Sequence, residues 1–279
     1  MEIKAADVAK LRAMTGAGMM DCKKALVEAE GDFDRAQDII REKGKLVAAK
    51  RADRTATQGV VASKIVGQKG YMLCLACETD FVAQNADFVA ATNAILDIAV
   101  EADAADLDAL LAVVKDGKTV AEIVTEKSGQ TGEKVELAYY GKIEAPMCVT
   151  YIHMNSKLGT LIGFNKEIDK EVAKDVAMQA AAMAPVSIDK GDCDPKIIEH
   201  ERMIGREQAR QEGKPEAMLD KIAEGKVNRF LKENTLLNQD LVKNNKISVG
   251  TYIKEADKDA TVIAYKRFSL NDYLPSKFH

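Results

Sequence analysis

The chain has 279 residues, 30% of them charged, and a formal net charge of -4 at pH 7. This length exceeds one average domain and predicts two or three modules with a sizeable buried core. The near-balance of charges argues against a nucleic-acid binder, which needs a basic stripe to displace counterions.

The sequence shows no sign of a membrane protein. Its apolar runs all fall short of the roughly 18 residues that a membrane span requires. The first residues, MEIKAADVAK, lack the apolar stretch of a signal peptide. We therefore expect a cytoplasmic protein that binds no membrane.

The cysteines are scattered and odd in number, which is typical of free thiols in a reducing compartment; they are Cys22, Cys74, Cys77, Cys148 and Cys193. Cys74 and Cys77 form a C-x-x-C pair, but inside a predicted strand, where positions three apart point to opposite faces. A zinc site needs two further ligands, and the sequence has no second pair. We therefore favour core packing and expect no metal.

The apolar pattern predicts three short helices within residues 1–50, which we take as an N-terminal helical module. The helices are expected to end at the turn Thr15 to Gly18, before Gly31 and at Gly44, with Asp32 as the cap of the third.

The turn Gly16-Ala17-Gly18 is similar to part of a dinucleotide-binding loop. A helix precedes it, however, and Asp21 occupies the place of the third glycine, so we exclude that interpretation. Met19 and Met20, at the start of the second helix, are expected to lie partly outside. Such methionines either fill gaps in the core or contact a partner, and both interpretations are open.

The segment from Lys45 to Gln58 is charged and rich in alanine, and we place the linker between modules at 51–58. The period then changes to that of strands. Val60 to Ile65 and Met72 to Glu78 are expected to form a hairpin around the turn Gly67 to Gly70.

The stretch after the second strand, Thr79 to Ala83, places the aromatic Phe81 next to Asp80. Asn85 is a good helix cap, which leaves Phe81 without an obvious packing role at the helix start. Two interpretations are open. If a helix starts at Asp80, Phe81 folds into the core; if it starts after Asn85, Phe81 is a protruding wedge on a binding loop.

Further helices are expected to cover this hairpin. After the helix that Asn85 caps, the spacing of Leu107 and Val114 predicts another helix that ends at Gly117. Thr119 and Glu122 form a capping box for the next one.

A second copy of the strand, turn, strand and helix pattern follows. Its strands are expected at Met147 to His153 and Leu158 to Phe164, and Asp169 precedes its helix. We infer two related α+β subdomains, 59–140 and 141–279, each with helices on one face of a small antiparallel sheet.

The second subdomain carries an insertion. Polar helices starting at Pro195 and Pro215 have so short a link that they must lie antiparallel, and we predict a protruding hairpin at about 195–232. A solvated arm and a second contact surface are both open interpretations. A helix capped by Ser248 and a strand from Thr261 to Phe268 complete the subdomain.

Two motifs carry a resemblance to a known family. TDFVA, from Thr79 to Ala83, resembles one signature of bacterial elongation factor Ts, and TGAGMMDCKKAL, from Thr15 to Leu26, resembles the other. The motifs have the expected separation, and the resemblance covers nearly the whole chain. It implies a guanine-nucleotide exchange factor that releases GDP from the GTPase elongation factor Tu during protein synthesis. Its N-terminal helical module would be of the UBA-like kind.

The resemblance also implies the contact residues. In this family a loop pushes into the GTPase near the nucleotide and disturbs its magnesium site, and that loop matches Thr79, Asp80, Phe81 and Val82. The residues expected to dock on a helix of the GTPase domain are Leu11, Arg12, Met19 and Met20. His153 matches a histidine that contacts another domain of the partner.

The expected partner is elongation factor Tu, both GDP-bound and nucleotide-free, with no nucleic acid, cofactor or chemical active site of its own. A homodimer and a dimer of heterodimers are both open. The chain departs from some family members after Phe268, since Ser269 to His279 leave little room for the further helix that those members append. Two other functions are alternatives: a thiol-redox protein using Cys74 and Cys77, and a scaffold that holds the GTPase without releasing GDP.

Overall fold

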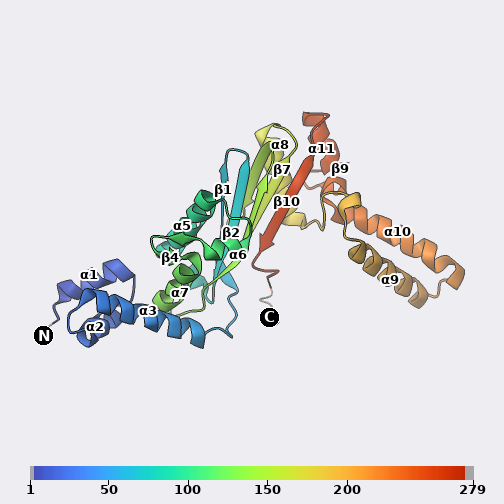
Figure 1. Cartoon of the computed structure of the whole chain (residues 1–279). Coiled ribbons are helices and arrows are strands. Elements are labelled where there is room, and N and C mark those ends of the chain that lie inside the picture. The colour runs from blue at the N-terminus through green and yellow to red at the C-terminus, as the bar shows by residue number, and fades with distance from the viewer. Residues whose placement is uncertain (1–2, 274–279) are drawn as a thin grey trace.

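The N-terminal residues fold into three helices around a small core of their own (Figure 1). The computed structural model describes residues 3–273, and these helices are α1 (Ala5–Thr15), α2 (Met19–Glu28) and α3 (Phe33–Lys50). Asp32 caps α3 as predicted, because its side chain accepts a hydrogen bond from the backbone N–H of Arg35 at 3.0 Å. The core contains Val8, Leu11, Cys22 and Leu26.

The third helix is longer than predicted, because it does not end at Gly44. Lys45 to Lys50 continue it, since leucine, alanine and lysine are good helix formers. Gly44 is instead a point of contact with a later helix, α7 (Val120–Thr131). The charged, alanine-rich segment from Lys45 is therefore helical as far as Lys50, and the expected linker at 51–58 is irregular up to Gln58, where the first strand begins.

The first sheet contains the expected hairpin of β1 (Gln58–Val66) and β2 (Lys69–Cys77). A third strand, β5 (Glu136–Glu144), pairs antiparallel with the other side of β2. The sequence pattern does not predict β5, because a register shift opposite Cys74 and Leu75 interrupts its alternation. The expected boundary after residue 140 lies inside this strand, and we propose a boundary after Glu144 instead.

Helices cover the outer face of the first sheet (Figure 1): α4 (Asp80–Ala83), α5 (Ala86–Ala102), α6 (Leu107–Ala112) and α7. The capping box of Thr119 and Glu122 at the start of α7 is confirmed.

The helix that we expected to run to Gly117 ends at Ala112. Asp116 and Gly117 have φ angles of 51° and 79° and form the two-residue turn of a small hairpin, β3 (Val114–Lys115) and β4 (Lys118–Thr119). An Asp-Gly pair is a strong hairpin signal. It prevails here over the helical spacing of Val114, whose side chain is exposed.

The second sheet has the order β10-β7-β6 and is antiparallel throughout. Its strands are β6 (Met147–Ile152), β7 (Leu158–Phe164) and β10 (Val262–Ser269). Its outer face packs on α8 (Lys170–Met183), which Asp169 caps, and on α11 (Val249–Ala256), which Ser248 caps. A small hairpin of β8 (Asp240–Leu241) and β9 (Asn244–Ser248) precedes α11.

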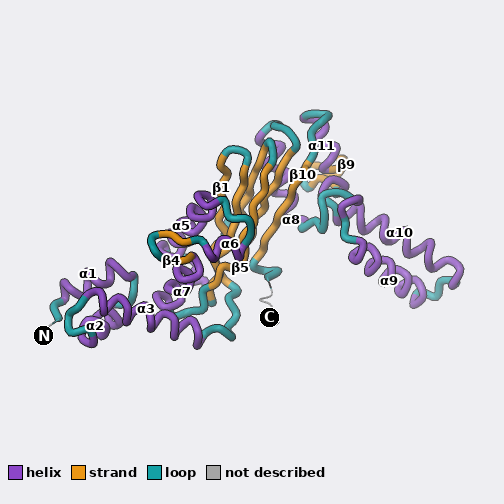
Figure 2. Tube along the Cα trace, viewed as in Figure 1, coloured by secondary structure: helices purple, strands orange, loops and turns teal. Residues whose placement is uncertain are grey.

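The two sheets pack on one another, with their helices on the two outer faces (Figure 2). Along β2, Leu73 and Leu75 face the helices, while Met72 and Cys74 face the second sheet. Cys74 and Cys77 accordingly lie in different core clusters, as the sequence predicted. The α+β class, with an N-terminal helical module and two small antiparallel sheets, is confirmed.

The predicted helical hairpin is present and stands out from the body of the protein (Figure 1). It consists of α9 (Pro195–Gln211) and α10 (Glu216–Asn234). The arginines along α9 pair with acidic residues of α10: Arg202 with Glu224, and Arg206 with Glu216 and Asp220. The polar side of the hairpin is therefore an ion-pair network between its own helices.

Within residues 3–273, none of the helices is both long and apolar enough to cross a membrane. The last residues of the segment Ser269 to His279, from residue 274 on, lie outside the described part of the chain.

Candidate functional site

A single helical turn, α4, follows the end of β2 and presents the motif from Thr79 to Ala83. The Thr79 hydroxyl caps this turn by accepting a hydrogen bond from the backbone N–H of Val82 at 3.4 Å. A second cap, Asn85, begins α5 by accepting a bond from the N–H of Asp87 at 2.8 Å. Part of each open interpretation therefore holds: a helical turn does start at Asp80, but Phe81 is not in the core.

Phe81 has 85% of its surface exposed, more than most apolar side chains in the described chain. Val82 packs against the core between the first sheet and its helices, and Ala83 is buried. These two residues therefore occupy the inward-facing positions of the turn. Burying a phenylalanine stabilises a fold by roughly 1.5–3 kcal/mol, and this exposed ring forgoes that contribution. Exposed Asp80 lies beside it. The turn therefore presents an aromatic ring and a carboxylate to the outside.

Glu78, directly before the turn, is held by two partners. Its Oε1 accepts a hydrogen bond from the backbone N–H of Lys134 at 2.6 Å, and Arg51 Nη1 lies 3.0 Å from both carboxylate oxygens. Burial favours the neutral carboxyl, but the bonds from Lys134 and Arg51 outweigh burial and keep the pKa of Glu78 below its usual range. The base of the turn is thus tied to the segment after α3 and to the segment after α7.

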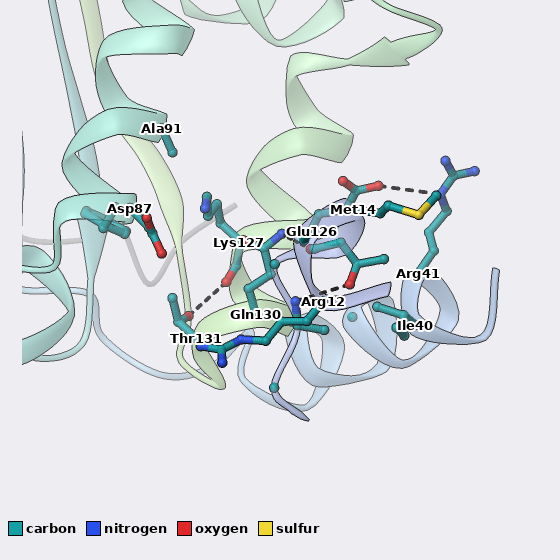
Figure 3. A pocket seen from close by; sticks show the side chains of 18 of the residues that line it. Arg12, Met14, Ile40, Arg41, Asp87, Ala91, Glu126, Lys127, Gln130 and Thr131 are labelled. Carbon is teal, nitrogen blue, oxygen red and sulfur yellow. Dashed lines mark hydrogen bonds and ion pairs between the residues drawn. The ribbon is translucent and has the colours of Figure 1, made fainter. Parts of the chain in front are cut away.

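A cleft of about 1140 Å³ lies between the N-terminal module and the first subdomain, beside the contact of α3 with α7. Figure 3 shows Asp87 and Ala91 of α5 on one side and Arg12 and Met14 of α1 on another, with side chains of α7 between them. Met19 and Val82 also line the cleft, so both motifs border the same space.

Charged side chains of α7 line this cleft. Glu126 Oε1 lies 3.5 Å from Arg41 Nε of α3 (Figure 3). Burial lowers the pKa of Lys127, while nearby Asp87 acts in the opposite direction.

The predicted residues of the N-terminal module differ in exposure. Arg12 is exposed, and Met19 and Met20 expose 49% and 64% of their surface. Leu11 has none of its surface exposed and lies in the core of the module. Its side chain is therefore not available for contact with a partner, unlike those of the other three residues.

His153 lies in the exposed turn after β6, and its Nδ1 is 3.0 Å from the hydroxyl of Tyr151. This turn packs against β1, because the Ser156 carbonyl accepts a hydrogen bond from Val61 N–H at 2.7 Å and Lys157 bonds to Gln58. Gln58 pairs with Cys77 at the end of β2, so the turn of His153 and the turn of Phe81 lie at the same end of the paired sheets.

Sequence reasoning missed the partners beneath the turn. Glu78 is the first charged residue after an apolar strand, and this position could have marked it as a carboxylate that needs polar partners. Arg51 and Lys134 are distant in sequence, in segments without a motif, so no local pattern could assign them.

Comparison with known proteins identifies similar chains. The family model described as "Elongation factor TS" matches residues 78–272. The elongation factor Ts of Porphyromonas gingivalis is 46% identical over 272 residues, covering 97% of this chain and 99% of that protein. The elongation factor Ts of Cytophaga hutchinsonii is 48% identical over 275 residues, with 96% and 99% covered. That of Christiangramia forsetii is 47% identical over 273 residues, with the same coverage.

Proposed function

Because the chain belongs to the elongation factor Ts family, the nucleotide exchange factors for elongation factor Tu, we propose that it releases GDP by inserting its Thr79–Val82 turn beside the magnesium and phosphate site of that GTPase. The observation that carries this proposal is the exposure of Phe81, 85%, on a turn whose base is held on two sides.

An exchange factor of this family needs no chemical active site. It binds the nucleotide-free GTPase more tightly than the GDP-bound one, and linkage then requires it to weaken GDP binding by the same factor. A coupling of about 4 kcal/mol corresponds to roughly a thousandfold in affinity.

The two exposed side chains of the turn have different tasks. GDP is held by backbone donors and by a magnesium ion that offsets the phosphate charge. Phe81 enters an apolar gap beside that site and displaces the elements that hold the ion and the phosphate. Asp80 carries a carboxylate, which disturbs the polar network around the ion.

The N-terminal module, residues 1–50, supplies docking contacts. Arg12, Met19 and Met20 form the contact surface for a helix of the GTPase domain, and methionine suits such a surface because its side chain adapts to the partner. Leu11 holds α1 in place under that surface. His153, at the same end as the wedge, contacts a further domain of the partner.

The complex forms in the cytoplasm, where protein synthesis takes place. A homodimer of the factor and a dimer of heterodimers are the two assemblies to be tested. Light scattering after size-exclusion chromatography, with the factor alone and with nucleotide-free GTPase, distinguishes them by mass.

The experiment is release of a fluorescent GDP analogue from elongation factor Tu, with and without the protein. Phe81→Ala is expected to lower the maximal release rate more than tenfold, since truncating a buried aromatic anchor costs about 2 kcal/mol or more. Val114→Ala removes an exposed apolar side chain elsewhere and is the matched control. Near-normal release with Phe81→Ala would reject the wedge, whereas binding without any acceleration by the wild type would indicate a scaffold.

A further inference from the structure

One short segment at the end of α7, residues 129–134, contacts both motifs. It contains Gln130 and Glu133, neither of which belongs to a motif. Its partners lie far away in the sequence, in the N-terminal module on one side and at the base of the wedge turn on the other.

Glu133 binds the start of the wedge turn through three hydrogen bonds. Its Oε2 accepts from the backbone N–H groups of Glu78 and Thr79, both at 3.0 Å, and its Oε1 accepts from the Thr79 hydroxyl at 2.6 Å. Bonds to a carboxylate are stronger than bonds between neutral groups. Because the same hydroxyl caps α4, the carboxylate fixes both the backbone and the cap of the turn that carries Phe81.

Gln130 makes the contact with the other motif. Its Nε2 donates a hydrogen bond of 2.6 Å to the backbone carbonyl of Thr15, the last residue of α1. Figure 3 shows Gln130 of α7 and Arg12 of α1, which both line the cleft. Gly16 adopts a φ of +67° directly after Thr15, and a Cβ atom there would lie 3.0 Å from the Gln130 amide nitrogen.

We infer that residues 129–134 are a bracket that sets the position of the wedge relative to the N-terminal docking surface, with Glu133 and Gln130 as its positioning residues. This inference rests on the proposed function, because it assigns a role to the support of the Phe81 turn. Glu133 fixes the orientation of the turn that carries Phe81. Gln130 holds the docking surface at the distance at which both elements reach one GTPase molecule.

The physical reason is preorganisation. A turn that is already fixed loses little freedom when it enters the partner, so more of the contact energy is available to weaken nucleotide binding. Loosening the turn should therefore reduce the displacement of GDP rather than the affinity for the GTPase. Loosening the docking surface should reduce the affinity instead.

The test measures GDP release over a range of factor concentrations, which separates the maximal rate from the half-saturating concentration. Glu133→Ala is expected to lower the maximal rate about tenfold, the effect of losing bonds to a charged group, with the half-saturating concentration within about twofold. Glu133→Gln keeps the side-chain shape: its amide oxygen can still accept from both backbone N–H groups, and its amide nitrogen can donate to the Thr79 hydroxyl oxygen. It is therefore expected to restore most of the rate.

A second variant tests the contact between the bracket and the N-terminal module. Gln130→Glu is isosteric but cannot donate to the Thr15 carbonyl. It is expected to raise the half-saturating concentration about fivefold, as expected for one lost hydrogen bond, and to leave the maximal rate unchanged.

A background variant distinguishes the inference from the proposed function. If Glu133 acts through the wedge, Glu133→Ala should cause no further loss of rate in a Phe81→Ala protein. Slow release with Phe81→Ala but normal release with Glu133→Ala would overturn the bracket alone. Equal slowing by Glu133→Ala and Glu133→Gln, full additivity with Phe81→Ala, or an unchanged half-saturating concentration with Gln130→Glu would also overturn it.

Discussion

Gly129 of α7 crosses Gly44 of α3 so closely that a Cβ atom on Gly129 would lie 2.4 Å from the Cα of Gly44. Both positions lack a side chain where two helix backbones meet. This crossing joins the N-terminal module to the first subdomain, beside the Gln130 contact.

The first prediction follows from this crossing. Gly129→Ala should destabilise the protein by about 1–3 kcal/mol, because the new methyl group meets backbone and the helices must move apart. Urea unfolding followed by circular dichroism measures the change. Gly225→Ala is the control, because Gly225 is exposed on α10 with nothing within 4 Å of an added Cβ. It should stabilise the protein by about 0.5–1 kcal/mol, and a similar gain with Gly129→Ala would contradict the close contact.

The second prediction concerns the thiols. All five cysteines are free and buried, and burial raises the pKa of the Cys77 thiol to about 12. The thiolate is the reactive form, so the native protein should not react with a thiol reagent at pH 8, whereas the urea-unfolded chain should react fully. A Cys74→Ser, Cys77→Ser protein should also keep its exchange activity. Rapid reaction of a native thiol, or loss of exchange in a folded variant, would revive the redox alternative.

The sequence was sufficient where one local signal determined an element. The caps Asp32, Asn85, Thr119 and Asp169 all begin helices at the predicted places. It failed where tertiary contacts decide the outcome. Gly44 reads as a helix end, but it lies inside α3, where its missing side chain lets Gly129 of α7 approach closely. The strand β5 depends on pairing with β2 across a register shift, which a local period does not reveal.

The same division holds for the candidate site: its local motif was predictable from the sequence, but its tertiary contacts were not. The motif around Phe81 indicated a wedge, but only the structure shows that the ring is exposed while Ala83 is buried. Glu133 and Arg51 hold the turn from distant segments, and spacing alone cannot assign such partners. For Leu11 the resemblance implied contact with the partner, whereas the structure buries its side chain in the core of the N-terminal module.

The third prediction is a pH dependence at the base of the wedge. The folded protein holds the pKa of Glu78 below its usual value of about 4.3, so the unfolded chain binds this proton more readily. The stabilisation is therefore fully present above about pH 4.3 and is lost as the pH falls through the folded value. Urea unfolding of the wild type and of Glu78→Gln checks this. Their difference in unfolding free energy should be largest near pH 7 and shrink below pH 4, and a constant difference would contradict it.

The fourth prediction tests the docking surface without touching the wedge. Met19→Ser with Met20→Ser removes two exposed apolar side chains, so the stability of the free protein should hardly change. If both become buried against the GTPase, each contributes roughly 1.5 kcal/mol or more, and the half-saturating concentration should rise at least tenfold. The maximal release rate should stay the same, because Phe81 is intact. Met183→Ser, at an exposed methionine of α8, is the matched control and should change neither quantity. A double variant that lowers the maximal rate at unchanged half-saturation would instead place these methionines in the displacement step.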